Sequence, residues 1–173
     1  MNHALVVFES MWGNTEEVAR AVADGLRESV TVDVADVAQH PGAPGDDVDL
    51  VVAGGPTHAF SMTRARTRFD ARDKGARQGA VDVGLREWLS DLPSGREHPR
   101  FATFDTRVRS VRHLPGSAAR SADRLARRHG YEELVPPESF WVQDMDGPLL
   151  DGELARAAAW GRDLGRRLRR TGH

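Results

Sequence analysis

Short apolar runs alternate with amphipathic segments along most of the chain. The nearly continuous apolar run at residues 4–9 predicts a strand that is covered on both faces. Directly after it, apolar residues recur at every fourth position, which predicts an amphipathic helix over residues 14–29. A buried strand followed at once by a helix is the first unit of an α/β fold.

The same alternation continues toward the C-terminus. The other strands are predicted at residues 30–34, 49–54, 100–104 and 134–143, the first of these at a sheet edge and the last interrupted by Pro136 and Pro137. The other helices are predicted at residues 85–92, 117–129 and 152–170, and the arginine-rich residues 61–79 predict a loop that leads to a short helix.

Five strands that alternate with helices predict an open parallel sheet with right-handed crossovers, a three-layer α/β/α sandwich. We expect a single domain over residues 1–173, because this length suits one hydrophobic core. Ligands of such sheets bind outside the carboxyl ends of the strands, where the strand order reverses. The loops after the first, third and fourth strands are therefore the first places to search for a site.

Composition and charge exclude several classes of protein. The chain has no cysteine, which excludes disulfide scaffolds, thiolate metal sites and cysteine nucleophiles. Its apolar runs are only strand-sized and no basic leader precedes them, so we expect a cytoplasmic protein without a membrane span. The 24 basic and 26 acidic residues nearly balance and the pI is about 6.4, which speaks against nucleic-acid binding.

The first strand is followed by a segment that runs directly into the first helix: Ser10, Met11, Trp12, Gly13, Asn14 and Thr15. Backbone N–H groups at a helix start lack partners and the helix dipole is positive there, so the segment is suited to hold a phosphate. The hydroxyls of Ser10 and Thr15 are further donors. The alternative is an ordinary helix start, in which Asn14 and Glu17 form a capping box and no ligand is needed.

Other motifs for phosphate or hydrolytic chemistry are absent from the sequence. The single lysine, Lys74, is followed by Gly75, so there is no G-x-x-x-x-G-K-[ST] loop, and no G-x-G-x-x-G follows a strand. The seven histidines form no H-E-x-x-H pair and no G-x-S-x-G elbow occurs. The sequence therefore does not support a P-loop NTPase, an ordinary dinucleotide fold, a zinc hydrolase or a serine hydrolase.

The segment from Ser10 to Thr15 resembles the phosphate loop of the flavodoxin family, whose pattern is [T/S]-x-T-G-x-T, with Trp12 in place of the second threonine. Residues 54–60 after the third strand are similar to the second flavin loop of that family, and the order of elements matches over essentially the whole chain. The resemblance implies a short-chain, flavodoxin-like fold with a five-stranded parallel sheet of order 2-1-3-4-5.

The resemblance also implies that FMN is the cofactor and that three segments bind it. Residues 10–15 would hold the phosphate. One side of the isoalloxazine would be bordered by Pro56, Thr57, His58, Ala59 and Phe60, and the other by Asp105, Thr106 and Arg107, just beyond the fourth strand. The third segment lacks the tyrosine that family members commonly stack on the ring, so the stacking candidates are Phe60, His58, Trp12 and His113.

Arginines cluster just after two of these loops: Arg64, Arg66 and Arg68, and Arg107, Arg109 and Arg112. If they converge on the mouth of the site, they stabilise an anionic reduced flavin, raise its reduction potential and attract anionic partners. The alternative is a hydrated, arginine-rich surface. A typical electron-carrying flavodoxin is strongly acidic, so this near-neutral chain departs from that pattern.

Two functions of different class fit these observations. The first is electron transfer through bound FMN, either as a carrier that docks to a redox partner protein or as a small oxidoreductase of anionic or quinone-like acceptors, in a monomer or a homodimer. The flavin supplies the chemistry, so no side-chain acid or base is required. The second is a flavodoxin-like domain without tight flavin binding that serves as an interaction or regulatory module.

Overall fold

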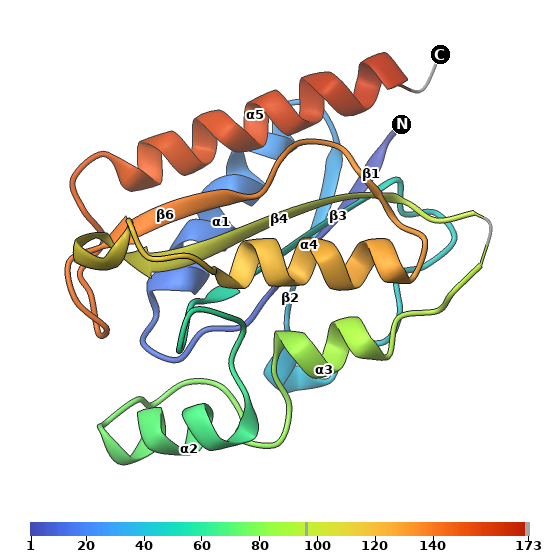
Figure 1. Ribbon diagram of the computed structural model, residues 1–173. Helices are drawn as coiled ribbons and strands as arrows, with labels where there is room; N and C mark the ends of the chain where they lie inside the picture. The colour runs from blue at the N-terminus through green and yellow to red at the C-terminus, as the bar shows by residue number, and fades with distance from the viewer. Residues whose placement is uncertain (96, 172–173) are drawn as a thin grey trace.

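Parallel strands at the centre of the molecule are covered by helices on both faces (Figure 1). The computed structural model describes residues 1–95 and 97–171. The strands are β1 (His3–Phe8), β2 (Thr31–Asp36), β3 (Leu50–Pro56), β4 (Arg100–Val108), β5 (Glu132–Glu133) and β6 (Glu138–Val142). The helices are α1 (Asn14–Arg27), α2 (Ala65–Asp73), α3 (Leu85–Ser90), α4 (Ala118–Arg128) and α5 (Glu153–Thr171), with short 3-10 turns η1 (Val37–Gln39) and η2 (Arg109–Val111).

The strand order is β2-β1-β3-β4, with β5 and β6 both parallel to the far side of β4. Val6 on β1 lies opposite Val34 on β2 and Val52 on β3. The fifth strand is interrupted between Glu133 and Glu138, around the two prolines, because proline has no N–H to donate to the ladder. The expected fold and the order 2-1-3-4-5 are confirmed.

Helices α1 and α5 pack on one face of the sheet, and α3 and α4 on the other, while α2 extends from the edge of the molecule in Figure 1. Glycines allow α1 and α5 to approach each other closely. A Cβ atom on Gly25 would lie 2.0 Å from the carbonyl oxygen of Ala158, and one on Gly161 would lie 2.2 Å from that of Val22. Among the described residues, no helix is long and apolar enough to span a bilayer.

Strand β4 extends four residues further than the sequence predicts. The apolar pattern ends at Phe104, but Asp105, Thr106 and Arg107 continue the strand with side chains that are buried. Hydrogen bonds to these side chains offset the cost of burying their polar groups. The strand can therefore continue through polar residues, which a search for apolar positions does not detect. The expectation that these three residues lie beyond the strand is therefore wrong.

Candidate functional site

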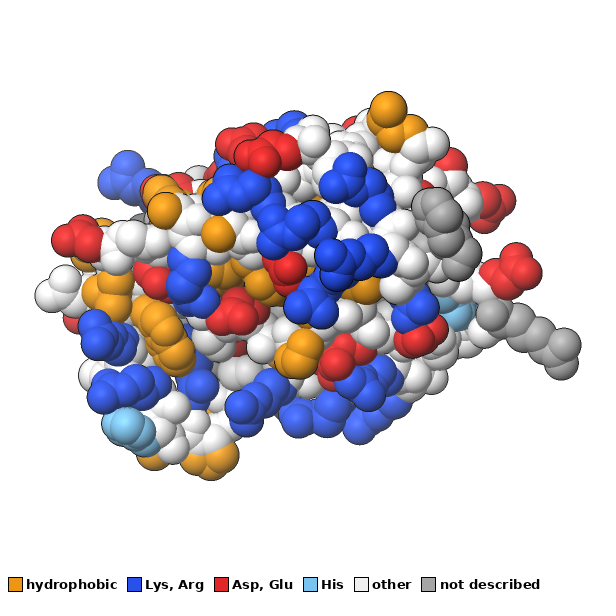
Figure 2. Space-filling model, turned by 90° about the horizontal axis from the view of Figure 1, so that it is seen from above, with side chains coloured by type: hydrophobic (Ala, Val, Ile, Leu, Met, Phe, Trp, Pro, Cys, Tyr) orange, Lys and Arg blue, Asp and Glu red, His pale blue; other side chains and the backbone are white. Residues whose placement is uncertain are grey.

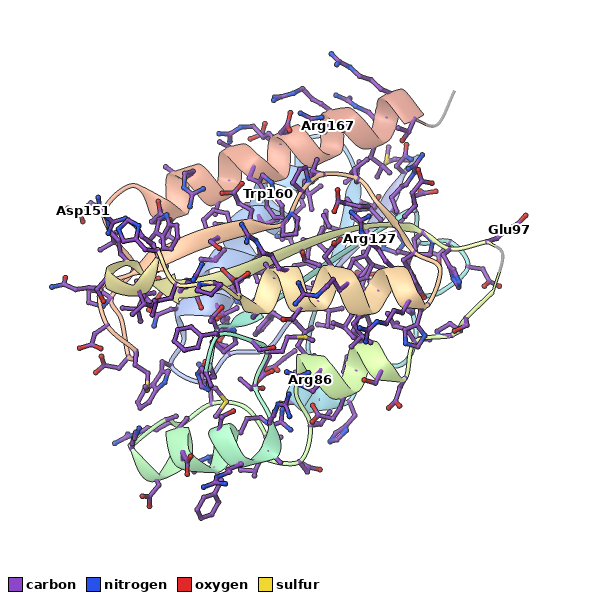
Figure 3. All side chains as sticks on the ribbon, in the orientation of Figure 1. Arg86, Glu97, Arg127, Asp151, Trp160 and Arg167 are labelled. Atoms are coloured by element: carbon purple, nitrogen blue, oxygen red, sulfur yellow. The ribbon has the colours of Figure 1, made fainter. Side chains whose placement is uncertain are left out.

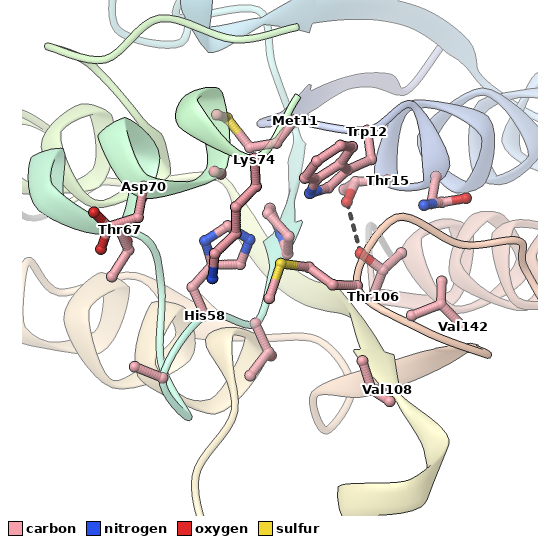
Figure 4. A pocket seen from close by; sticks show the side chains of 16 residues that line it. Met11, Trp12, Thr15, His58, Thr67, Asp70, Lys74, Thr106, Val108 and Val142 are labelled. Atoms are coloured by element: carbon pink, nitrogen blue, oxygen red, sulfur yellow. Dashed lines mark hydrogen bonds between the residues drawn. The ribbon is translucent and has the colours of Figure 1, made fainter. Parts of the chain in front are cut away.

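The carboxyl ends of the strands and helix α2 enclose a cleft (Figure 4). Its lining includes residues from each of the three predicted segments and, in addition, residues of α2 and of the loop after β6. The lining residues are Met11, Trp12, Asn14, Thr15, Pro56, Thr57, His58, Ala59, Thr67, Asp70, Ala71, Lys74, Thr106, Val108, Val142 and Met145. The fold thus brings the turn after β1, the turn after β3 and the end of β4 to one cleft.

The turn after β1 leads into α1 through Gly13, whose φ of 95° lies in the left-handed region that favours glycine. Gly13 is the N-cap, and Asn14 is already the first helical residue. The predicted capping box of Asn14 and Glu17 is therefore wrong, and no N-cap side chain bonds to the helix start. Instead, Ser10 reaches forward, and its hydroxyl oxygen accepts the N–H groups of Gly13 at 3.1 Å and Glu16 at 3.3 Å.

Three polar groups of this turn remain available to a ligand. The backbone N–H groups of Asn14 and Thr15 have no hydrogen-bond acceptor among the residues that the structure describes. The indole Nε1 of Trp12 is buried and also lacks a partner there, and Figure 4 shows it on the side of the ring that faces the cleft. An unpaired buried donor costs about 1–3 kcal/mol, so an acceptor bound at this turn would recover that free energy.

A pair of hydroxyls connects α1 to β4 at the base of the cleft. Thr15 Oγ1 and Thr106 Oγ1 lie 2.7 Å apart and are buried, as the dashed line in Figure 4 marks. One hydroxyl donates to the other, so the accepting hydroxyl keeps its own hydrogen for a ligand. Both residues belong to the predicted set and lie in the same cleft.

The turn after β3 is closed by two backbone hydrogen bonds between His58 and Ser61, at 2.9 and 3.1 Å. Ala59 and Phe60 within it have positive φ values of 47° and 63°. Phe60 is 47 % exposed and does not line the cleft. Of the proposed stacking candidates, Trp12 and His58 line the cleft, whereas Phe60 and His113 do not.

His58 is the titratable side chain whose properties the cleft changes most clearly. Burial lowers the pKa of His58 below its usual value of 6.5, and the positive charges of Lys74 and Arg68 act in the same direction. The imidazole is therefore neutral at pH 7. Lys74 itself lines the cleft as the C-cap of α2, a position that the sequence analysis did not connect with the site.

An NMR titration of the His58 ring is expected to give a pKa below 6.5. We expect the Lys74→Met substitution to raise the pKa of His58 and the Lys74→Arg substitution to leave it unchanged. The unfolded chain binds the proton more tightly than the folded protein, so stability falls as the pH drops below about 6.5 and through the folded-state pKa of His58. A pKa at or above 6.5 in the wild-type protein would contradict this environment.

Alternation along β4 separates the three residues of the third predicted segment. Thr106 faces the cleft, but Asp105 is fully buried on the opposite face, where its carboxylate accepts the Thr57 hydroxyl and the Ala119 N–H, each at 3.0 Å. Burial raises the pKa of Asp105. Arg107 donates to the carbonyls of Val111 and Leu114 in the following loop. Asp105 and Arg107 thus support the cleft without lining it.

A buried polar network behind the turn was missed by the sequence analysis. Glu9, directly before Ser10, is 1 % exposed and accepts the Thr63 hydroxyl and the Leu85 N–H at 2.8 Å. Burial raises the pKa of Glu9. Arg68 is fully buried and donates two hydrogen bonds to the Glu87 carboxylate, at 2.7 and 3.1 Å, and one to Thr63 at 2.9 Å.

This network corrects the expectation for the arginines. Arg68 joins α2 to α3 and Arg107 secures the loop after β4, so neither lies at the mouth of the cleft. A glutamate at the end of an apolar strand was the available signal for a buried network. Its partners could not be inferred, because they lie more than 50 residues away along the chain.

Comparisons with known proteins agree with the fold. The family model described as Flavodoxin matches residues 6–80, which include the turn after β1, the turn after β3 and helix α2. Among curated proteins, none matches the sequence.

Solved flavodoxins share the fold over nearly the whole chain. A flavodoxin from the domain Archaea is 18 % identical, with 96 % of this chain and 99 % of that chain covered and a TM-score of 0.62. The flavodoxin of Streptococcus pneumoniae TIGR4 is 21 % identical, with coverages of 95 % and 99 % and a TM-score of 0.62. A short-chain flavodoxin associated with a PDU bacterial microcompartment is 17 % identical, with both chains covered completely and a TM-score of 0.58. The chain therefore has the flavodoxin-like fold.

Proposed function

We propose that this chain binds FMN in the cleft and transfers electrons through it. The observation that carries the proposal is the turn after β1, where two backbone N–H groups and the buried indole N–H of Trp12 have no acceptor within residues 1–95 and 97–171, beside a cleft. A phosphate supplies several strong acceptor oxygens and a negative charge, both of which suit a helix start. The family match over residues 6–80 supports the same cofactor.

The proposal assigns a role to each segment that meets at the cleft. Residues 10–15 hold the phosphate, and Trp12 donates from its indole where the family pattern has a threonine hydroxyl. Residues 56–59 border the ring on one side and Thr106 on the other, with Asp105 and Arg107 behind it. FMN, when bound, supplies a ring that takes up and releases electrons.

The side chains around the cleft orient the cofactor and set its electrostatic environment. The neutral His58 offers a flat surface to an aromatic ring, and Lys74 places a positive charge at the cleft. The proposal requires no side chain that acts as an acid or a base.

The colour and flavin content of the purified protein test the proposal. We expect a yellow protein that releases FMN on denaturation, or a colourless one that takes up FMN in a titration at micromolar concentration. Absence of uptake at that concentration would contradict electron transfer and favour an interaction or regulatory module. Consumption of NADPH, measured with and without a quinone, then separates a small reductase from a carrier.

Lys74→Met is expected to lower the midpoint potential of the bound flavin. A positive charge at the cleft stabilises the electron-rich reduced ring, so its removal favours the oxidised form by on the order of tens of millivolts. Lys74→Arg keeps the charge and serves as the control. An unchanged or raised potential in Lys74→Met, measured by spectroelectrochemistry, would show that Lys74 does not act on the flavin.

A further inference from the structure

One face of α4 carries a row of arginines without an acidic partner in the part of the chain that the structure describes. Arg120, Arg124 and Arg128 are exposed and follow one another at intervals of four residues, so they share a face of the helix. Within residues 1–95 and 97–171, none of the three forms an ion pair. Like charges at this spacing repel each other and weaken the helix, and the fold itself does not require the row.

Some other arginines, on α4 itself and on α5, are paired with carboxylates. Arg127, on the side of α4 away from Arg86 in Figure 3, binds Asp123 and Glu133. On α5, Arg166 and Arg167 both bind Asp163. Figure 2, which looks onto the α5 side, accordingly shows red acidic side chains among the blue ones. Among the described residues, the row thus lacks the carboxylate partners that Arg127, Arg166 and Arg167 have.

The row borders a polar groove between α3 and α4. Its polar lining consists of Ser61, Arg86, Ser90, Ser121, Arg124 and Arg128. The guanidinium of Arg86 is fixed in place by the Ser61 hydroxyl at 3.0 Å and the Met62 carbonyl at 2.9 Å. Several guanidinium groups and hydroxyls around one groove are suited to receive a carboxylate.

The groove lies next to the proposed flavin cleft. Ser61 lines the groove and His58 lines the cleft, and these two residues are joined by their backbone hydrogen bonds. The exposed side chain of Phe60 stands between them in the chain, and a Cβ on Gly116, just before α4, would lie 3.0 Å from it. At the left of Figure 2, where the strands end, hydrophobic side chains lie beside basic ones. An apolar centre beside a charged rim is typical of a docking surface.

We propose that the α3–α4 face docks the acidic surface of a redox partner protein, with a partner carboxylate entering the groove. The inference rests on the proposed function, because the partner would exchange electrons with a flavin in the adjoining cleft. The partner's metal centre gives up one electron and the flavin gains it, with no bond made or broken. Asp144 and Asp146 are exposed on the loop after β6, and their charge is opposite to that of the α4 arginines. The difference in charge between the loop after β6 and α4 fixes the orientation of the partner.

Binding of two probe proteins of opposite charge tests the docking surface. Oxidised plant-type ferredoxin serves as the acidic probe and cytochrome c as the basic one, and both are titrated calorimetrically at about 20 mM and about 300 mM NaCl. The titrations use protein with and without FMN, so a failure of flavin binding is recognised separately. We expect ferredoxin to bind at low salt, more tightly than cytochrome c, and to lose at least about tenfold in affinity at high salt.

Charge-reversal variants locate the surface. The double variant Arg120→Glu/Arg124→Glu on α4 is expected to weaken ferredoxin binding at least about tenfold. The control is the double variant Arg169→Glu/Arg170→Glu on α5, which changes the net charge by the same amount. We expect it to leave the affinity for ferredoxin within about twofold. Tighter binding of cytochrome c, or equal effects of the two pairs, would overturn the proposal. The proposal would also be overturned if the α4 variant raised the KM for NADPH and left ferredoxin binding unchanged. The groove would then bind the phosphate of a dinucleotide and not a partner carboxylate.

Discussion

Gly13→Asp is expected to abolish FMN binding, with an affinity at least about 100-fold below that of the wild-type protein. The added carboxylate would stand at the start of α1, where the open N–H groups of the turn are proposed to receive the phosphate. A Cβ on Gly13 meets no atom closer than 3.9 Å, so the side chain has room and acts through its charge. An aspartate at this position also favours the helix dipole, so the cofactor-free protein keeps its fold.

Gly13→Asn is the matched control, because asparagine has the same shape and shares the strain of a positive φ but carries no charge. We expect it to lose less than about tenfold in FMN affinity, and riboflavin, which has no phosphate, to bind both variants alike. Flavin fluorescence quenching measures all four affinities. Equal FMN affinities for the aspartate and asparagine variants would show that the phosphate lies elsewhere.

Arg68→Ala is expected to lower the free energy of unfolding by about 3–5 kcal/mol. The substitution removes a fully buried guanidinium, and with it two hydrogen bonds to the Glu87 carboxylate and one to the Thr63 hydroxyl. Glu9 loses a nearby positive charge as well, at the point where the chain enters the turn after β1. Denaturant unfolding followed by circular dichroism measures the loss.

Two variants on the same helix define the origin of that loss. Arg66→Ala removes an exposed guanidinium and should change stability by no more than about 0.5 kcal/mol. Arg68→Lys keeps the charge but cannot donate two parallel hydrogen bonds to Glu87, so an intermediate loss is expected. Similar stabilities of the two alanine variants would show that the buried network contributes little.

The fold could be predicted from local patterns because its strands and helices each carry a clear periodicity. Strand β1 and helix α1 were located within two residues at each end, and even the interruption near Pro136 follows from the chemistry of proline. The end of β4 could not be predicted, since its polar residues are buried only through contacts with α1, α4 and the loop after η2. Such contacts leave no signal in the neighbouring sequence.

The predicted site divides in the same way. The turns after β1 and β3 are local features, and residues from both line one cleft. Lys74 and Met145 join that cleft through tertiary packing, and no motif marks either of them. The family resemblance implies that Asp105, Thr106 and Arg107 all border the ring, whereas the pleat of β4 turns only Thr106 of the three toward the cleft.

The comparison of FMN with riboflavin in a titration of the wild-type protein tests the phosphate site most directly. The two ligands share the ring and the ribityl chain and differ only in the phosphate, so the ratio of their dissociation constants isolates the contribution of the turn after β1. We expect FMN to bind at least about 100-fold more tightly than riboflavin. Equal affinities would contradict the account, because the N–H groups of the turn and the Trp12 indole would then contribute nothing to binding.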